Sequence, residues 1–100
     1  MLISLFEVGD NMSILTQQEA ANALRLPNSD DPLMMLLLPS VDDTIKTATG
    51  HDWAADTIID PTAKLAAILM LVSMHTGIEL SPQYAALIGQ LHAKVANGEI

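Results

Sequence analysis

The feature that most constrains the fold is an unbroken apolar run from Leu65 to Val72, in a chain of 100 residues with a formal net charge of -8. Lipid, the chain's own fold or a neighbouring subunit must hide such a run from water. The wider stretch from Ala63 to Met74 has only about twelve residues, whereas a membrane-spanning helix needs about 20. We therefore expect no membrane contact, and we expect other helices or subunits to cover the run.

Composition narrows the fold class and the partners. Half of the residues are apolar, but the aromatic ones are only Phe6, Trp53 and Tyr84, and the abundance of Leu, Ile, Ala and Met favours helices. A chain of this size buries only roughly 60 to 70% of its unfolded surface, so association would supplement a limited core. The absence of cysteine excludes disulfides and thiolate metal sites and fits a reducing cytoplasm. The acidic balance opposes tight binding to nucleic acid.

Cap signals predict helices at several places along the chain. A Thr-x-x-Glu capping box opens one helix, and a capping residue followed by proline opens three others. Glycine closes two of them, because it accepts the left-handed conformation at a helix C-terminus. The expected helices span residues 17–26, 32–49, 61–76 and 82–97. Short connections between them predict an all-α fold, a small bundle of about four helices.

Apolar spacing suggests which faces of two helices are buried. On the second helix the expected apolar positions are Leu33, Leu36, Leu37, Val41, Ile45 and Ala48. On the fourth helix they are Tyr84, Leu87, Ile88, Leu91 and Val95.

Two residues add detail to this bundle. Pro39 lies inside the second helix and is expected to kink or split it near Leu38, because proline lacks an N–H and its ring clashes with the preceding turn. Trp53, in the irregular segment 50–60, is expected to fold back as a lid over the core.

The N-terminal residues lack a sustained helical period, so we expect an N-terminal arm at 1–15 and a helical domain at 16–100. Residues 1–8 are largely apolar but have no basic leader, and we do not interpret them as a targeting sequence.

The residues capable of chemistry have simpler structural roles. His51, Asp52 and Asp56 could supply nitrogen and oxygen ligands to a metal, but their spacing matches no metal motif, and such residues are ordinary beyond a helix end. His75 and His92 lie near helix C-termini, where the helix dipole favours an imidazolium. Motifs of hydrolases, phosphate-binding loops, zinc proteases and dinucleotide sites are not present. We expect no enzyme, no metal and no cofactor.

The methionines suggest an alternative function, the binding of a partner protein. Met34, Met35, Met70 and Met74 could form an adaptable binding groove, although methionine at helical spacing is more often core. A helical interaction module, such as a regulatory or chaperone-like phage protein acting as monomer or dimer, would use such a groove.

The basic residues are too dispersed to form a nucleic-acid footprint. They are Arg25, Lys46, Lys64 and Lys94. They can solvate the surface and compensate helix ends, or form salt bridges to acidic residues of a neighbouring copy.

Taken in order, several segments resemble the phage head-tail connector (adaptor) family. They are MSILTQQEAANALRLP, the DDP turn, the helix end TIKTATG, DPTAKLAAILMLVSMHTG and a last short helix, over about residues 12–97. The matching positions are Ile14, Leu15, Thr16, Glu19, Ala20, Leu24, Asp30, Asp31, Ile45, Ala48, Thr49, Gly50, Pro61, Ala63, Lys64 and Leu65. These are signatures of fold and carry no catalytic motif.

The resemblance implies a structural virion protein, made in the bacterial host cytoplasm and placed at the head-tail junction. Subunits of this family form a ring, typically of about twelve copies, beneath the portal protein. The ring would extend the DNA channel and bind the next tail-side connector or stopper protein, with no cofactor. Met12 matches the family's usual start, so residues 1–11 are either an added arm or an upstream start.

An acidic ring would let DNA slide through by repelling its phosphates. The candidate channel or rim residues are Asp42, Asp43, Asp30 and Asp31. The candidate inter-subunit contacts are Lys64, Arg25, Met70, Met74 and Phe6.

Overall fold

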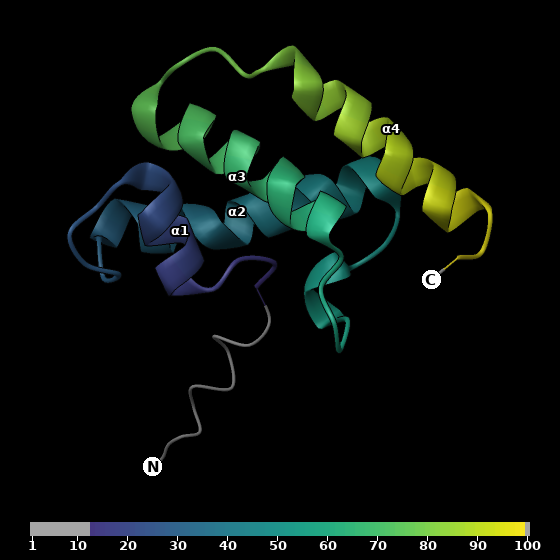
Figure 1. Cartoon of the computed structure of the whole chain (residues 1–100), viewed down its shortest axis with the longest axis horizontal. Coiled ribbons are helices and arrows are strands. Elements are labelled where there is room, and N and C mark those ends of the chain that lie inside the picture. Colours follow the sequence, from purple (N-terminus) through teal and green to yellow (C-terminus); the bar gives the residue numbers. More distant parts are fainter. Residues whose placement is uncertain (1–12, 100) are drawn as a thin grey trace.

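The computed structural model describes residues 13–99, and within them it contains helices and no strand (Figure 1). The elements are α1 (Gln17–Leu24), α2 (Pro32–Thr49), the short 3-10 helix η2 (Trp53–Ala55), α3 (Pro61–Thr76) and α4 (Pro82–Ala96). The all-α class predicted from the sequence is confirmed. Phe6 and the rest of the expected arm up to residue 12 lie outside the described residues.

The helices begin where the cap signals predicted. The Thr16 hydroxyl accepts from the Glu19 amide at 3.0 Å, and the Glu19 carboxylate accepts from the Thr16 amide at 2.9 Å, which completes the capping box. Asp31, Asp60 and Ser81 cap the other α-helices, each followed by proline at the first helical position. Local sequence therefore determines all four α-helix starts.

Glycine is the C-cap of two of the four α-helices in the described residues. Gly50 and Gly77 take the left-handed conformation with φ of 83° and 75° and end α2 and α3. Arg25 takes the same conformation with φ of 59°, and α1 therefore ends at Leu24. The expected end at residue 26 was wrong, because the sequence around Arg25 contains no glycine to mark the turn.

Pro39 does not split α2, which runs without a break from Pro32 to Thr49. Proline removes the hydrogen bond that the Met35 carbonyl would otherwise receive. Pro39 is exposed, as is Met35, so water can reach that carbonyl. The expectation of a split near Leu38 was wrong for this reason.

Long-range contacts between side chains fix how the helices are arranged. His75 at the end of α3 contacts Asp31 at the start of α2, and Lys94 near the end of α4 contacts Asp60 at the start of α3. Consecutive long helices therefore pack antiparallel, and α1 lies against α3 and α2 (Figure 1). The molecule is flat, with extents of 40 × 32 × 18 Å. Its thickness is less than two helix diameters of about 10 to 12 Å each.

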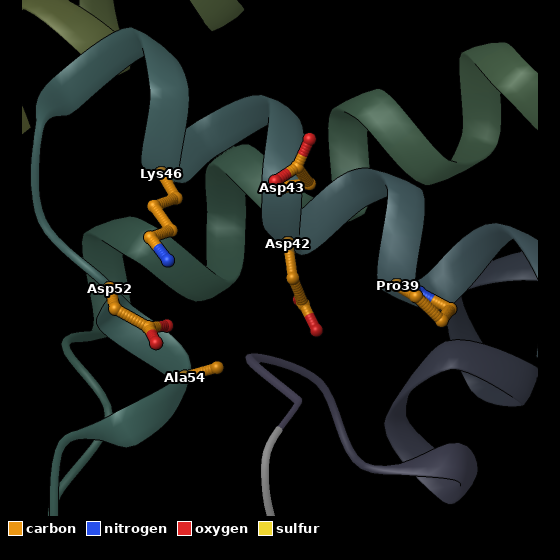
Figure 2. Close-up of a pocket in the computed structure, with 6 residues that line it drawn as sticks. All are labelled: Pro39, Asp42, Asp43, Lys46, Asp52 and Ala54. Carbon is orange, nitrogen blue, oxygen red and sulfur yellow. The ribbon is translucent and has the colours of Figure 1, made fainter.

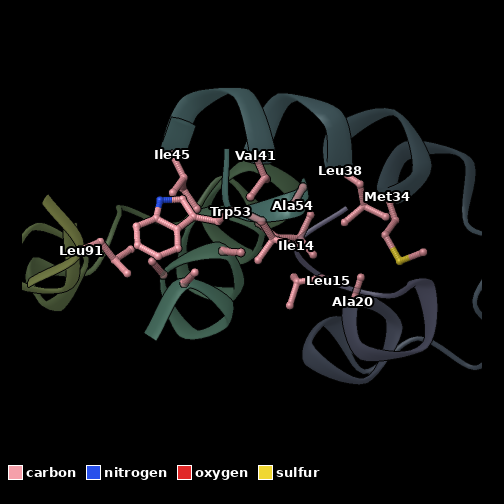
Figure 3. Packing of buried hydrophobic residues seen from close by; sticks show 14 of the residues in the cluster. Ile14, Leu15, Ala20, Met34, Leu38, Val41, Ile45, Trp53, Ala54 and Leu91 are labelled. Atoms are coloured by element: carbon pink, nitrogen blue, oxygen red, sulfur yellow. The ribbon is translucent and has the colours of Figure 1, made fainter. Parts of the chain in front are cut away.

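Trp53 lies in the core, fully buried, between α2 and Leu91 of α4 (Figure 3). Its indole N–H donates to the Thr49 hydroxyl at 2.8 Å, and that hydroxyl donates to the Ile45 carbonyl at 2.8 Å. The indole is thus satisfied without water, as buried polar groups require. Trp53, which we expected to form a lid over the core, is instead a central part of the core.

Ile14 and Leu15, which we expected to lie in the arm, are also buried in this core. Figure 3 shows Ile14 beneath Val41 and beside Ala54. The folded domain therefore includes residues before α1.

The described part of the chain covers α3 incompletely. Ala63, Ala66, Ala67 and Leu71 are fully buried, whereas Leu65 is 48% exposed and Met74 is 36% exposed.

None of the helices in the described part of the chain has the length and hydrophobicity that a membrane span requires.

Candidate functional site

The predicted acidic residues lie in two separate places. Asp42, Asp43 and Asp52 line a hollow of about 230 Å³ beside α2, together with Lys46, Pro39 and Ala54 (Figure 2). Asp30 and Asp31 instead line a second hollow, before the start of α2. The structure therefore does not gather the four expected rim residues into one patch.

Asp42 is tied to its own chain. Its carboxylate accepts from the Ser13 hydroxyl at 2.8 Å and from the Ile14 amide at 3.1 Å. Burial raises the pKa of Asp42 above its ordinary value, with a smaller contribution from the charge of Asp52, and the two hydrogen bonds oppose this rise only in part. Asp42 thus anchors the start of the domain to α2.

Asp43 is exposed, and Figure 2 shows its side chain leaving the helix in a different direction from that of Asp42. Successive residues of an α-helix project about 100° apart, so the two carboxylates do not act as a pair. Of the two residues, Asp43 is the one that presents its charge to solvent.

Asp31 also has an internal role. It accepts from the Met34 amide at 2.9 Å and lies 3.2 Å from His75 Nε2. The hydrogen bond from Met34 lowers the pKa of Asp31, and the contact with His75 adds to this effect. The cap was predictable from the sequence, but the partner on α3 was not.

Lys64, the first of the expected inter-subunit contacts, has partners within its own chain. Its Nζ lies 2.6 Å from Glu19 Oε1 and donates to the Ile14 carbonyl at 3.2 Å. Burial raises the pKa of Glu19, but the hydrogen bonds from Lys64 and Thr16 outweigh it and leave this pKa lowered. Lys64 therefore links α3 to α1 and to the segment before it.

The other expected contacts differ in their exposure. Arg25 is exposed at the end of α1, and Met74 is exposed on the last turn of α3. Met70 is half-buried and packs against the core.

The three residues considered as metal ligands do not form one cluster. His51 Nε2 lies 2.9 and 3.0 Å from the two carboxylate oxygens of Asp56. The His51 ring packs edge-on against the Trp53 ring, with the two ring centroids 4.6 Å apart. Asp52 lines the hollow beside α2 instead. Among residues 13–99, no group of three or more potential metal ligands comes together.

The most prominent surface feature is apolar. Large side chains that stay exposed are Leu33 (46%), Met35, Leu36 (74%), Ile58 (85%), Leu65, Met74 and Ile78. Leu33, Leu36 and Ala48 were expected on the buried face of α2 but are exposed. Met34 and Leu38 occupy that face instead, with Val41 and Ile45. The stretch 32–39 is apolar on every side, so its periodicity does not identify the inner face.

The expected apolar face of α4 is confirmed. Leu91 is buried, and Tyr84, Leu87, Ile88 and Val95 pack against the core. The Tyr84 hydroxyl is buried without a hydrogen-bond partner among the described residues.

Comparison of the chain with protein-family models, with curated proteins and with solved structures finds no match.

Proposed function

We propose that this protein is a structural subunit of a tailed phage, a head-tail connector that assembles into a homo-oligomeric ring beneath the portal. In this function the ring lengthens the DNA channel and binds a tail-side connector or stopper protein. The subunit has no catalytic role.

The observation that carries this proposal is the set of exposed apolar side chains on α2 and α3. Leu36 at 74% exposure and Leu65 at 48% belong to helices that otherwise form the core of the domain. Burying an exposed leucine contributes roughly 1.5 to 3 kcal/mol. Contiguous exposed apolar patches mark surfaces that another protein covers, and Leu33 and Leu36 lie one helical turn apart on α2.

The charge of the chain disfavours tight DNA binding and is compatible with a surface along which DNA slides. The formal net charge of -8 repels phosphates, and only four basic residues are available to bind them. Two of these, Lys64 and Lys94, already pair with carboxylates in the chain. A ring of such subunits would present an acidic surface to DNA.

Electron microscopy of the purified protein, alone and with the portal protein of the same phage, tests this function. The expected result is a closed ring that sits coaxially on the tail-side face of the portal. A protein that stays monomeric or dimeric, and leaves the portal unchanged, would instead support a helical interaction module.

A further inference from the structure

The surface carries an apolar ridge and an apolar groove. The ridge consists of Leu33 and Leu36, one helical turn apart on the first half of α2. The groove lies between α3 and α4 and is lined by Leu65, Gln83, Ala86, Leu87 and Gln90, with a volume of about 220 Å³. An apolar cavity of about 150 Å³ already admits a benzene molecule, so this groove has room for a leucine side chain.

Both surfaces lack charge in a strongly acidic chain. Residues 32–41 of α2 contain no charged residue, and neither do residues 65–74 of α3 or residues 82–91 of α4. Two copies with a net charge of -8 each repel one another over most of their surfaces. The uncharged ridge and groove therefore allow two copies to approach with less repulsion than acidic surfaces would.

The ridge and the groove are distinct regions of the subunit. The contact between His75 and Asp31 places the start of α2 at the end of α3. Leu65 lies ten residues before His75, which corresponds to about 15 Å along the helix. A contact between ridge and groove is therefore heterologous, and each added copy leaves a free ridge and a free groove. Such contacts continue until a ring closes or a filament forms.

We propose that the Leu33–Leu36 ridge of one copy inserts into the α3–α4 groove of the next copy. This inference rests on the proposed function, because it assigns the contact that builds the ring. The occupant of the groove is a second copy of this chain.

Cross-linking tests the contact directly, because the chain has no cysteine of its own. Leu36→Cys places a thiol on the ridge, and Gln90→Cys places one in the groove. When the two variants are mixed with a short bis-maleimide, we expect a cross-linked dimer that neither variant gives alone. The doubly substituted chain should give a ladder of multiples.

Ile58→Cys is the matched control, since Ile58 is the most exposed of the large apolar side chains among residues 13–99 and belongs to neither surface. It should not cross-link to Gln90→Cys. Cross-linking of Leu36→Cys to itself alone would overturn the inference in favour of a symmetric contact. Assembly without the mixed dimer would overturn it as well, and would point to another occupant of the groove, such as the apolar residues 1–8.

Leu36→Asp provides a second measurement. We expect it to raise the dissociation constant of self-association at least tenfold, whereas Ile58→Asp should leave this constant unchanged. Equal effects of the two variants would contradict a role of the ridge in self-association. If the mixed dimer forms but no ring joins the portal, the contact holds and the connector function fails.

Discussion

At the scale of single residues, the hydroxyl of Thr49 links the buried Trp53 side chain to α2. Thr49 accepts from the indole of Trp53 and donates to the Ile45 carbonyl. It is the only polar residue among the buried ones in the described part of the chain. Its hydroxyl therefore satisfies an N–H that no solvent can reach.

Thr49→Val should lower the free energy of unfolding by about 1 to 3 kcal/mol, because the buried indole N–H loses its acceptor. Thr47→Val, at an exposed position of the same helix, is the control and should change stability by less than about 0.5 kcal/mol. Urea unfolding followed by the fluorescence of the single tryptophan measures both. Equal effects would show that the indole hydrogen bond contributes no stability.

A second prediction at this scale concerns pH. The folded state raises the pKa of Asp42 through burial, so folding favours its protonated form. The stability that Asp42 contributes is present below its unfolded pKa and is lost as the pH rises through its folded pKa. Asp42→Asn removes this titration. We expect the stability of the variant, relative to the parent, to increase as the pH rises above 3.8.

The measurement is urea unfolding of both proteins over a series of pH values. Asp43→Asn, which removes the same charge from the exposed neighbouring position, is the control. A difference between Asp42→Asn and the parent that does not vary with pH would contradict the role of burial.

At the scale of the elements, local signals predicted helix starts well and helix faces unevenly. Caps involve residues two to three positions apart, so Thr16, Asp31 and Asp60 were readable from the sequence. The inner face of α2 was not, because leucines and methionines surround its first half. Tertiary packing, which selected Met34 and Leu38 for the core, decides such a case.

The same distinction applies to the candidate site. The sequence identified acidic residues but not their partners, because the bonds from Ser13 and Ile14 to Asp42 span 29 and 28 positions. The link between Lys64 and Glu19 spans 45 positions. No local pattern encodes such distances.

Pro39 allows a prediction at the level of α2. Pro39→Ala restores an N–H for the Met35 carbonyl and removes the ring from the helix interior, where proline costs about 3 kcal/mol relative to alanine. Proline also reduces the entropy of the unfolded chain, which offsets part of this gain. We expect a net stabilisation of about 1 to 2 kcal/mol.

Thermal unfolding of Pro39→Ala by circular dichroism measures this effect. Pro32→Ala is the control, because a first-turn proline has no helical hydrogen bond to lose. If both variants behaved alike, the interior proline would have no cost in this helix.

At the scale of the whole molecule, a flat acidic domain leaves leucines of its core-forming helices in water. Its extents of 40 × 32 × 18 Å and the limited burial available to a short chain favour further cover by a partner. High salt should strengthen self-association, because it screens repulsion between copies of net charge -8.

The most direct test of the proposed function is native mass spectrometry of the protein over a range of concentrations, alone and with the portal protein that is its proposed partner. We expect a closed oligomer of one defined copy number, built from subunits of 10.7 kDa, that forms either alone or when the portal protein is added. A single 10.7 kDa species under every condition, together with an unchanged mass of the portal, would contradict it.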